Sequence, residues 1–267
     1  MPTQEAKREG RVRIPVPGPW FRYWLLFIAI LIFLGLWELV VYLGSYPSFI
    51  LPRPQEVLRR SMVVMRDGTL WHHTRSTLLE VFLGLGLGLS VATVLGYLLA
   101  KSQPLERLIS PYIVASQAIP IVALAPLLVI WFGFGLLSKV VVCALIVFFP
   151  VLVNTIVGLR SVERELVDLL RSLEANRWQM LTILEAPAAL PVLLGGLKIG
   201  VTLSVVGAVV GEFVAANEGL GFLINLSRGL FDTPLMFVAL FTLVIIALAL
   251  YGSVVVLEGI LLSWRQT

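Results

Sequence analysis

The stretch Ser172–Pro191, SLEANRWQMLTILEAPAALP, is a polar, amphipathic island in a 267-residue chain that is 58% hydrophobic. Leucines around its start recur at the i, i+3, i+4 and i+7 spacing of one helix face: Leu166, Leu169, Leu170 and Leu173. Trp178, Leu181 and Leu184 resume this stripe, and Pro187 and Pro191 are expected to stop regular helix. Two short amphipathic helices on one surface of so apolar a chain indicate that something docks there.

Composition places the rest of the chain in a membrane. A mean hydropathy of +0.96 with only 13% charged residues excludes a soluble globular domain and a disordered chain. Long apolar runs must satisfy their own backbone hydrogen bonds in lipid, so they predict transmembrane helices, and they are too uniform for the strands of a membrane barrel. The single cysteine, Cys143, excludes an intrachain disulfide. The sequence therefore predicts an all-α integral membrane protein, and nothing in it indicates nucleic acid as a partner.

About six transmembrane helices can be placed, each near the length that a bilayer requires. They are Tyr23–Leu43, Thr77–Ala100, Pro111–Phe132, Ser138–Val157, Pro191–Val214 and Pro234–Leu261. We expect a basic tail at 1–22 and a transmembrane domain at 23–267, with the amphipathic loop at about 158–190. Lys and Arg are more frequent in the tail and in the loops on its side, which predicts that both termini and the amphipathic loop are cytoplasmic.

Two further patterns concern packing. Pro52-Arg-Pro54 begins a short helix with an apolar stripe, which ends at Asp67-Gly68 and is expected at the outer membrane face. A solvated connector is the alternative. Glycines at small-xxx-small spacing predict close helix approach in the second and fifth spans: Gly84, Gly86, Gly88 and Gly96, then Gly196, Gly200, Gly207 and Gly211.

Several motifs occur in the order found in a known group of transporters. They are Leu51-Pro-Arg-Pro54, Ser116-Gln-Ala-Ile-Pro120, Ala125-Pro-Leu-Leu-Val-Ile-Trp-Phe-Gly-Phe-Gly135 and Phe149-Pro150. From about Leu51 to the C-terminus, the chain resembles the permease subunits of ABC importers, in the nitrate/sulfonate/taurine-type branch. The resemblance implies a type I ABC importer permease fold with cytoplasmic coupling helices.

The resemblance also implies a docking loop for a separate ATPase. Its family pattern begins Glu-Ala-Ala and carries a glycine a few residues later. Here Asp168 keeps the acidic start, whereas Leu169 and Leu170 replace the alanines and Glu174 stands where the family has glycine. The residues expected to dock are Asp168, Arg171, Leu173, Glu174, Ala175, Asn176 and Arg177.

Partners and location follow from the same resemblance. It implies two ABC ATPase subunits, a second permease subunit in a homodimer, an extracytoplasmic substrate-binding protein and the lipid of a prokaryotic cytoplasmic (inner) membrane. The chain has no Gly-x-x-x-x-Gly-Lys-Ser/Thr loop, so ATP and Mg are expected on the ATPase, with no cofactor on this chain. No nucleophile and base stand together in the sequence, so we expect a transport subunit and no enzyme.

Polar and helix-breaking residues within the spans are candidates for the translocation path: Gln117, Pro120, Pro126, Asn154 and Glu212. A packing kink is the alternative for the prolines, and an interface anchor is the alternative for Glu212, which is expected to stay ionised near the membrane surface. Lys198 is expected to snorkel towards headgroups. His72-His73 lacks the neighbouring ligands of a metal site.

Two other classes of function remain open from the sequence. An ATP-independent secondary transporter or channel would need no docking helices and usually shows an internal repeat, which is absent. A membrane-embedded enzyme would need clustered acid, base or metal-binding residues in its spans. The substrate stays open between a small anion, such as nitrate, a sulfonate or taurine, and a vitamin or pyrimidine-type precursor, because no dense basic lining argues for an anion.

Overall fold

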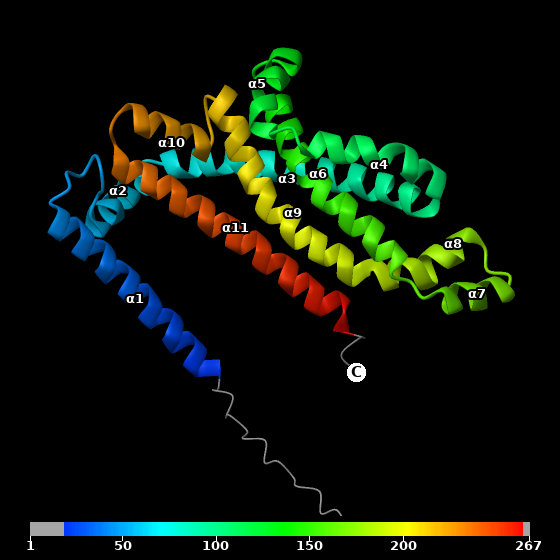
Figure 1. Cartoon of the computed structure of the whole chain (residues 1–267). Helices are drawn as coiled ribbons and strands as arrows, with labels where there is room; N and C mark the ends of the chain where they lie inside the picture. Colours follow the sequence, from blue (N-terminus) through cyan, green and yellow to red (C-terminus); the bar gives the residue numbers. More distant parts are fainter. Residues whose placement is uncertain (1–18, 264–267) are drawn as a thin grey trace, which may run out of the picture. The chain divides into compact units, whose positions relative to one another are not determined.

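The structure is a computed structural model that describes residues 19–263, and this part of the chain is helical with no strand (Figure 1). It divides into two compact units, Met1–Gln55 and Glu56–Thr267. Most of the predicted basic tail, together with Arg265, lies outside the described residues.

The first unit contains α1 (Pro19–Gly44), which confirms the span expected at Tyr23–Leu43. Its last turns are joined to the following segment by side chains. The indole of Trp37 donates a hydrogen bond of 3.0 Å to the Pro52 carbonyl. The carboxylate of Glu38 lies 3.9 Å from the Arg53 guanidinium.

Four long helices form the frame of the second unit: α3 (Thr69–Lys101), α6 (Leu136–Arg160), α9 (Ala186–Ala215) and α11 (Thr233–Leu261). Each contains an apolar window long enough to cross a bilayer, which confirms four more of the predicted spans. The most extensive helix contacts are those of α6 with α9 and with α3, so α6 lies between them. Ala92 and Leu99 of α3 pack with Val147, Val151 and Leu152 of α6 in one buried cluster of this core.

The third predicted span is not a continuous helix over Pro111–Phe132. It is replaced by α4 (Gln103–Gln117) and α5 (Ile121–Phe132), which meet at an angle of 97°. Pro120 precedes α5 and has an extended backbone. Its ring disfavours helical geometry at Ile119, and it has no N–H to donate to the preceding turn, so α4 does not continue through it. Pro111 and Pro126 stay inside the two helices. The described chain therefore has five spans, or six if this bent pair crosses once.

Glycines let α6 approach both of its neighbours, as the spacing predicts. A methyl group placed on Gly88 would come within 2.6 Å of the Ala144 carbonyl oxygen, and one on Gly207 within 2.7 Å of the Cys143 Cα. Gly84, Gly96, Gly196 and Gly211 are similarly close to α6, whereas nothing lies within 4 Å of the corresponding position at Gly86.

Short helices lie at the two ends of the long ones. At one end, called the α10 end here, are α2 (Pro54–Arg66) and α10 (Leu220–Gly229). The two Arg60–Asp232 contacts, at 2.7 and 2.9 Å, join α2 to the start of α11. Asp67 follows α2 and accepts the Thr69 amide at 2.9 Å, a hydrogen bond that lowers the pKa of Asp67. The helix expected after Pro52 is thus confirmed.

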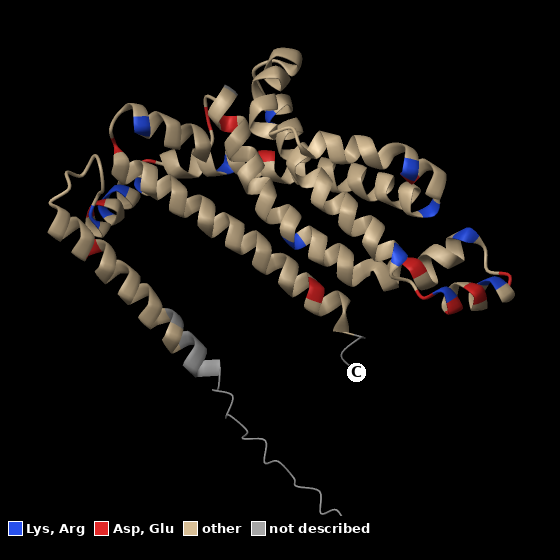
Figure 2. Ribbon diagram, viewed as in Figure 1, with Lys and Arg blue, Asp and Glu red and all other residues tan. Residues whose placement is uncertain are grey.

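At the opposite end, called the α7 end, are α7 (Arg164–Ser172) and α8 (Arg177–Gln179), followed by a π-helical turn at Met180–Glu185. Figure 2 shows charged residues gathered on α7 and α8, while α6, α9 and α11 carry few along their lengths. Because α3, α6 and α11 run from the α10 end to the α7 end and α9 runs back, the alternation of direction predicted for these spans is present.

The prediction that Pro187 and Pro191 end regular helix is wrong. Helical structure runs continuously from Arg177 to Ala215, and both prolines lie in α9. The π-helical turn directly precedes α9, whose second residue is Pro187, and the ring nitrogen of this proline has no N–H for the regular bond to the turn before it. The wider turn accommodates the first proline instead of stopping the helix.

Candidate functional site

The first candidate site is the docking segment, defined as Arg164–Glu185. Its helices leave large apolar side chains in contact with solvent at an end of the molecule where charged residues gather: Leu169 is 55% exposed, Leu173 68% and Trp178 71%. Exposed apolar side chains of this size, next to charged ones, mark an interaction surface. The predicted amphipathic helices are therefore present, and Leu169, Leu173 and Trp178 of their apolar stripe are not covered by any other part of the described chain.

Glu174 sits at the turn between α7 and α8 in the left-handed backbone region, with φ at +57°. The Glu174 amide donates to the Arg171 carbonyl at 3.0 Å, and the next amide, of Ala175, donates to the Leu170 carbonyl at 3.0 Å. This is the arrangement of a helix C-terminus that glycine usually adopts. Glu174, at the position where the ABC importer pattern has glycine, thus adopts the backbone conformation that glycine favours.

Asn176 starts α8 through reciprocal hydrogen bonds with Gln179. The Asn176 side-chain oxygen accepts the Gln179 amide at 2.8 Å, and the Gln179 side-chain oxygen accepts the Asn176 amide at 2.8 Å. Arg171 and Asp168 form a 3.5 Å contact on α7, and both are exposed. The seven residues expected to dock thus lie on α7, at the start of α8 and in the turn between them, all exposed except the half-buried Ala175.

Ion pairs join this segment and its neighbours to the spans. Glu185, the last residue of the π-helical turn, is buried and paired with Lys101 at the end of α3. Arg160, at the end of α6, pairs with Glu106 at the start of α4. The docking segment is thus linked to α3 by the ion pair of Glu185 with Lys101, and to α9 by the continuous backbone.

A second candidate site lies at the break between α4 and α5. Gln117 and Pro120 line a cavity of about 360 Å³ together with Phe149 of α6. Two of the residues predicted to line the translocation path, Gln117 and Pro120, thus line the same cavity. Pro126 lies further along α5 and is exposed, while Asn154 lies on α6, where its amide donates to the Pro150 carbonyl at 2.8 Å and its Cβ faces Gly196.

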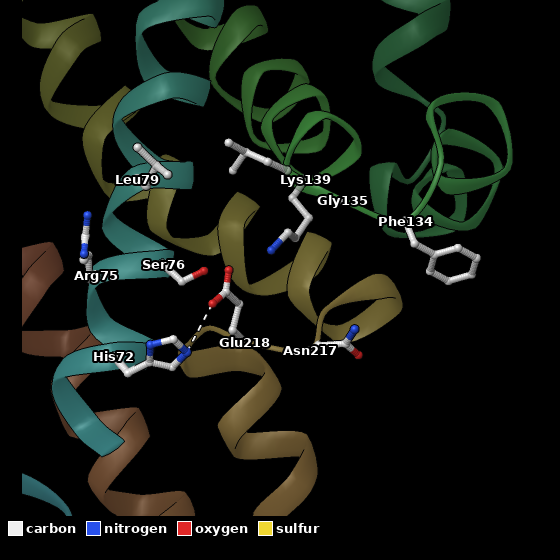
Figure 3. Close-up of a pocket in the computed structure, with 10 residues that line it drawn as sticks. His72, Arg75, Ser76, Leu79, Phe134, Gly135, Lys139, Asn217 and Glu218 are labelled. Carbon is white, nitrogen blue, oxygen red and sulfur yellow. Dashed lines mark ion pairs between the residues drawn. The ribbon is translucent and has the colours of Figure 1, made fainter. Parts of the chain in front are cut away.

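A third candidate site is a cavity of about 470 Å³ at the α10 end. His72, Arg75 and Ser76 of α3 line one side, and Lys139 and Glu218 face it from α6 and from the segment after α9 (Figure 3). His72 Nε2 lies 3.2 Å from a Glu218 carboxylate oxygen, and both side chains are exposed. The lining combines charges of both signs with the apolar side chains of Leu79, Phe134 and Leu136.

Glu212 does not line that cavity, although it lies in the last turn of α9 at the α10 end, where the sequence places it. Its side chain is 1% exposed and belongs to a buried cluster with Glu80 and Lys139. The Thr77 hydroxyl donates to one Glu212 oxygen at 2.6 Å, and the Gly221 amide donates to the other. Glu212 is therefore hydrogen-bonded to α3 and to the first turn of α10.

The same cluster holds the start of α10. Three consecutive amides, of Gly219, Leu220 and Gly221, donate to His73 Nδ1 at 3.0 Å, Thr77 Oγ1 at 2.8 Å and Glu212. Sequence reasoning assigned no role to Thr77 or Glu80. The available signal was the presence of ionisable residues within spans, among them Glu80, Lys139 and Glu212, but pairing these three requires the relative heights of three helices.

Lys198 has a partner on another helix that the sequence did not identify. Its ammonium pairs with Glu258 near the end of α11. Pairing within the protein removes both charges from lipid, which is the usual solution for ionisable residues inside spans. Among the described residues, no group of three or more His, Cys, Asp or Glu side chains has the arrangement of a metal site.

Comparison with known proteins identifies the architecture. The family model described as binding-protein-dependent transport system inner membrane component matches residues 84–262. The chain belongs to this family of ABC transporter permeases. The permease fold also matches a chain of the MetNI methionine ABC transporter in an inward-facing conformation, with a TM-score of 0.65 and 20% identity over 75% of this chain and 97% of that one.

Relatives of this permease differ in the solute that their names give. The chain is 51% identical to the riboflavin transport system permease protein RibX of Chloroflexus aurantiacus, over 90% of each chain. It is 36% identical to the formylaminopyrimidine transport permease protein ThiX of Halalkalibacterium halodurans, over 88% of this chain and 94% of that one. Identity to the taurine transport system permease protein TauC of Escherichia coli is 30%, over 88% and 87%.

Proposed function

We propose that this permease forms the translocation path of an importer for a heterocyclic vitamin or vitamin precursor, with riboflavin as the first solute to test. The observation that carries the proposal is the gradient of similarity. Identity is 51% to a riboflavin permease and 36% to a formylaminopyrimidine permease, against 30% to a sulfonate permease and a taurine permease, at similar coverage.

The cavity at the α10 end supports this choice over a compact anion. Arg75 and Lys139 are offset there by Glu218, and Lys139 is already paired with Glu80. A site for a small anion would be expected to present an excess of donors and positive charge. A mixed lining with apolar and aromatic side chains suits a planar molecule with polar edges.

Coupling to ATP hydrolysis is assigned to the docking segment. Its exposed Leu169, Leu173 and Trp178 would fill a groove on a separate ATPase chain, which would hold ATP and Mg, and Asp168, Arg171 and Arg177 would form the polar rim. We assign two copies of the permease to one complex with two ATPases, and an extracytoplasmic binding protein that delivers solute at the α10 end. The α7 end and both termini would then be cytoplasmic in the inner membrane.

Uptake by cells lacking other riboflavin carriers tests the solute. Cells expressing the permease with its ATPase and binding protein should accumulate riboflavin, measured by flavin fluorescence, and a large excess of unlabelled taurine should not compete. Competition by taurine, or uptake of labelled taurine without riboflavin uptake, would assign the anion class and overturn the proposal. The same cells without the ATPase gene serve as the control.

A further inference from the structure

The buried cluster at the α10 end has more negative than positive charge when its groups are ionised. Glu80 is 0% exposed, Glu212 1% and Lys139 5%. Lys139 pairs with Glu80 Oε1, and the Ser76 hydroxyl reaches the same oxygen at 3.4 Å. The Glu80 and Glu212 carboxyl groups are neighbours in this cluster and interact with each other. Two carboxylates thus share a single ammonium, and an uncompensated buried charge costs several kcal/mol.

No other group facing the cluster supplies the missing positive charge. His73 of α3 accepts the Gly219 amide with Nδ1, so its ring is neutral in this arrangement. Cys143 of α6 donates its thiol hydrogen to the Ser204 carbonyl at 3.3 Å and carries no charge in doing so. Arg75 and His72 are on exposed faces of α3, and α5 and α10 present no ionisable side chain at this place.

One oxygen marks where a proton is needed. Glu80 Oε2 is buried and has no hydrogen-bond partner among the described residues. Both oxygens of Glu212 already accept hydrogen bonds, from the Thr77 hydroxyl and from the amide of Gly221 in the first turn of α10. A helix N-terminus favours a negative charge, so Glu212 is the better anion of the two. A hydrogen on Glu80 Oε2 would make this oxygen a hydrogen-bond donor, and the neighbouring Glu212 carboxylate would be its acceptor.

We propose that Glu80 and Glu212 form a proton-binding site, in which Glu80 holds the proton on Oε2 and donates it to ionised Glu212, so that with Lys139 the cluster is neutral. The site fastens the start of α10 to α3, α6 and α9 at the α10 end. Because it concerns the folded chain alone, this inference is independent of the transported solute and of the docking partner.

Infrared spectroscopy of the purified full-length chain tests the proton. At neutral pH the spectrum should contain the carbonyl stretch of a protonated carboxylic acid, separate from the carboxylate bands. Glu80→Gln should remove it. Glu185→Gln is the matched control, because Glu185 is also buried, lysine-paired and left with an unpartnered Oε2, but its one-to-one pair needs no proton. Absence of the band in the unmodified chain, or its survival in Glu80→Gln, would overturn the proposal.

Hydrogen exchange at the start of α10 tests which carboxyl is the anion. Glutamine resembles a protonated glutamic acid in shape and charge, so Glu80→Gln should leave the amides of Gly219, Leu220 and Gly221 as protected as before. Glu212→Gln removes the anion that accepts the Gly221 amide and should speed exchange there at least tenfold. Faster exchange in Glu80→Gln than in Glu212→Gln would place the proton on Glu212 and contradict the assignment.

Discussion

Glu174 holds a backbone conformation that residues with a side chain rarely adopt. Its φ of +57° places Cβ close to the following carbonyl oxygen, which costs roughly 1–2 kcal/mol relative to a right-handed conformation. The turn is nonetheless formed, because the amides of Glu174 and Ala175 close hydrogen bonds to the end of α7. The strain is stored at the point where α7 meets α8, within the docking segment.

Replacing Glu174 with glycine should relieve this strain. We expect Glu174→Gly to stabilise the closed turn by about 1 kcal/mol and to slow hydrogen exchange of the Glu174 and Ala175 amides several-fold. The matched control is Glu165→Gly in the first turn of α7, where the same substitution should loosen the helix by about 0.5–1 kcal/mol. Equal effects of the two changes would show that the left-handed geometry at Glu174 carries no strain.

The helix face on which a residue lies could be predicted from the sequence better than the residue on another helix that it contacts. The docking leucines and the close-packing glycines follow from spacing alone. The partner of Lys198 does not, because Glu258 lies on another helix, and the spacing within one helix carries no information about it. The burial of Glu212 was missed for the same reason: its partners Thr77 and Glu80 come from α3.

At the scale of helices, α6 is the element that the rest of the bundle is built around. Lipid offers apolar surface everywhere, so helices associate in it through close packing and polar contacts more than through burial. The glycines of α3 and α9 bring both backbones against α6 at Ala144 and Cys143. Cys143 is thus the place where all three helices approach one another.

A methyl group should be costly at one glycine and harmless at another. Gly207→Ala would bring Cβ to 2.7 Å from the Cys143 Cα, which is backbone and cannot rotate away, so we expect a loss of about 1–3 kcal/mol and a lower melting temperature of the purified chain. Gly86→Ala meets nothing within 4 Å and should stabilise α3 by up to about 1 kcal/mol. A harmless Gly207→Ala would contradict the packing of α9 on α6.

We expect the docking segment to transmit conformational changes of the ATPase to the membrane-spanning helices. Leu173→Asp should leave membrane insertion intact, since no long helix contains this residue, and should abolish co-purification of the ATPase or uncouple its hydrolysis from uptake. Leu230→Asp at the α10 end is the matched control, being exposed to a similar degree, 66% against 68%, at the other end of the molecule. Normal ATPase binding and normal uptake in Leu173→Asp would remove this segment from the interface.

The boundaries of the helices could be predicted from the sequence only in part. The ends of the long spans were predicted closely, because a bilayer imposes length and apolarity on them, whereas α3 and α9 begin before their predicted starts at Thr77 and Pro191. Proline has opposite outcomes at two places in the chain. The helix bends between α4 and α5, but it continues through Pro187 and Pro191. Proline removes a donor in both places, and only the surrounding turns decide whether the helix breaks or widens.

For the whole molecule, the proposed translocation path makes the cavity beside Gln117 accessible to water. A cysteine at Gln117 in a Cys143→Ala background should react with a water-soluble thiol reagent, and its rate of labelling should change when ATP binds to the assembled complex, as alternating access requires. Val94→Cys, exposed on the apolar length of α3, should stay unlabelled because it faces lipid. No labelling at Gln117 in any nucleotide state would assign this residue to packing.

The central claim is that this permease moves its solute only when a separate ATPase drives it through the docking segment. The most direct measurement is solute uptake into proteoliposomes that contain the purified permease with or without its ATPase, with binding protein and solute outside and ATP enclosed on the ATPase side. The account predicts uptake that requires both the ATPase and hydrolysable ATP. Uptake at the same rate by the permease alone would contradict it and would identify an ATP-independent transporter or channel.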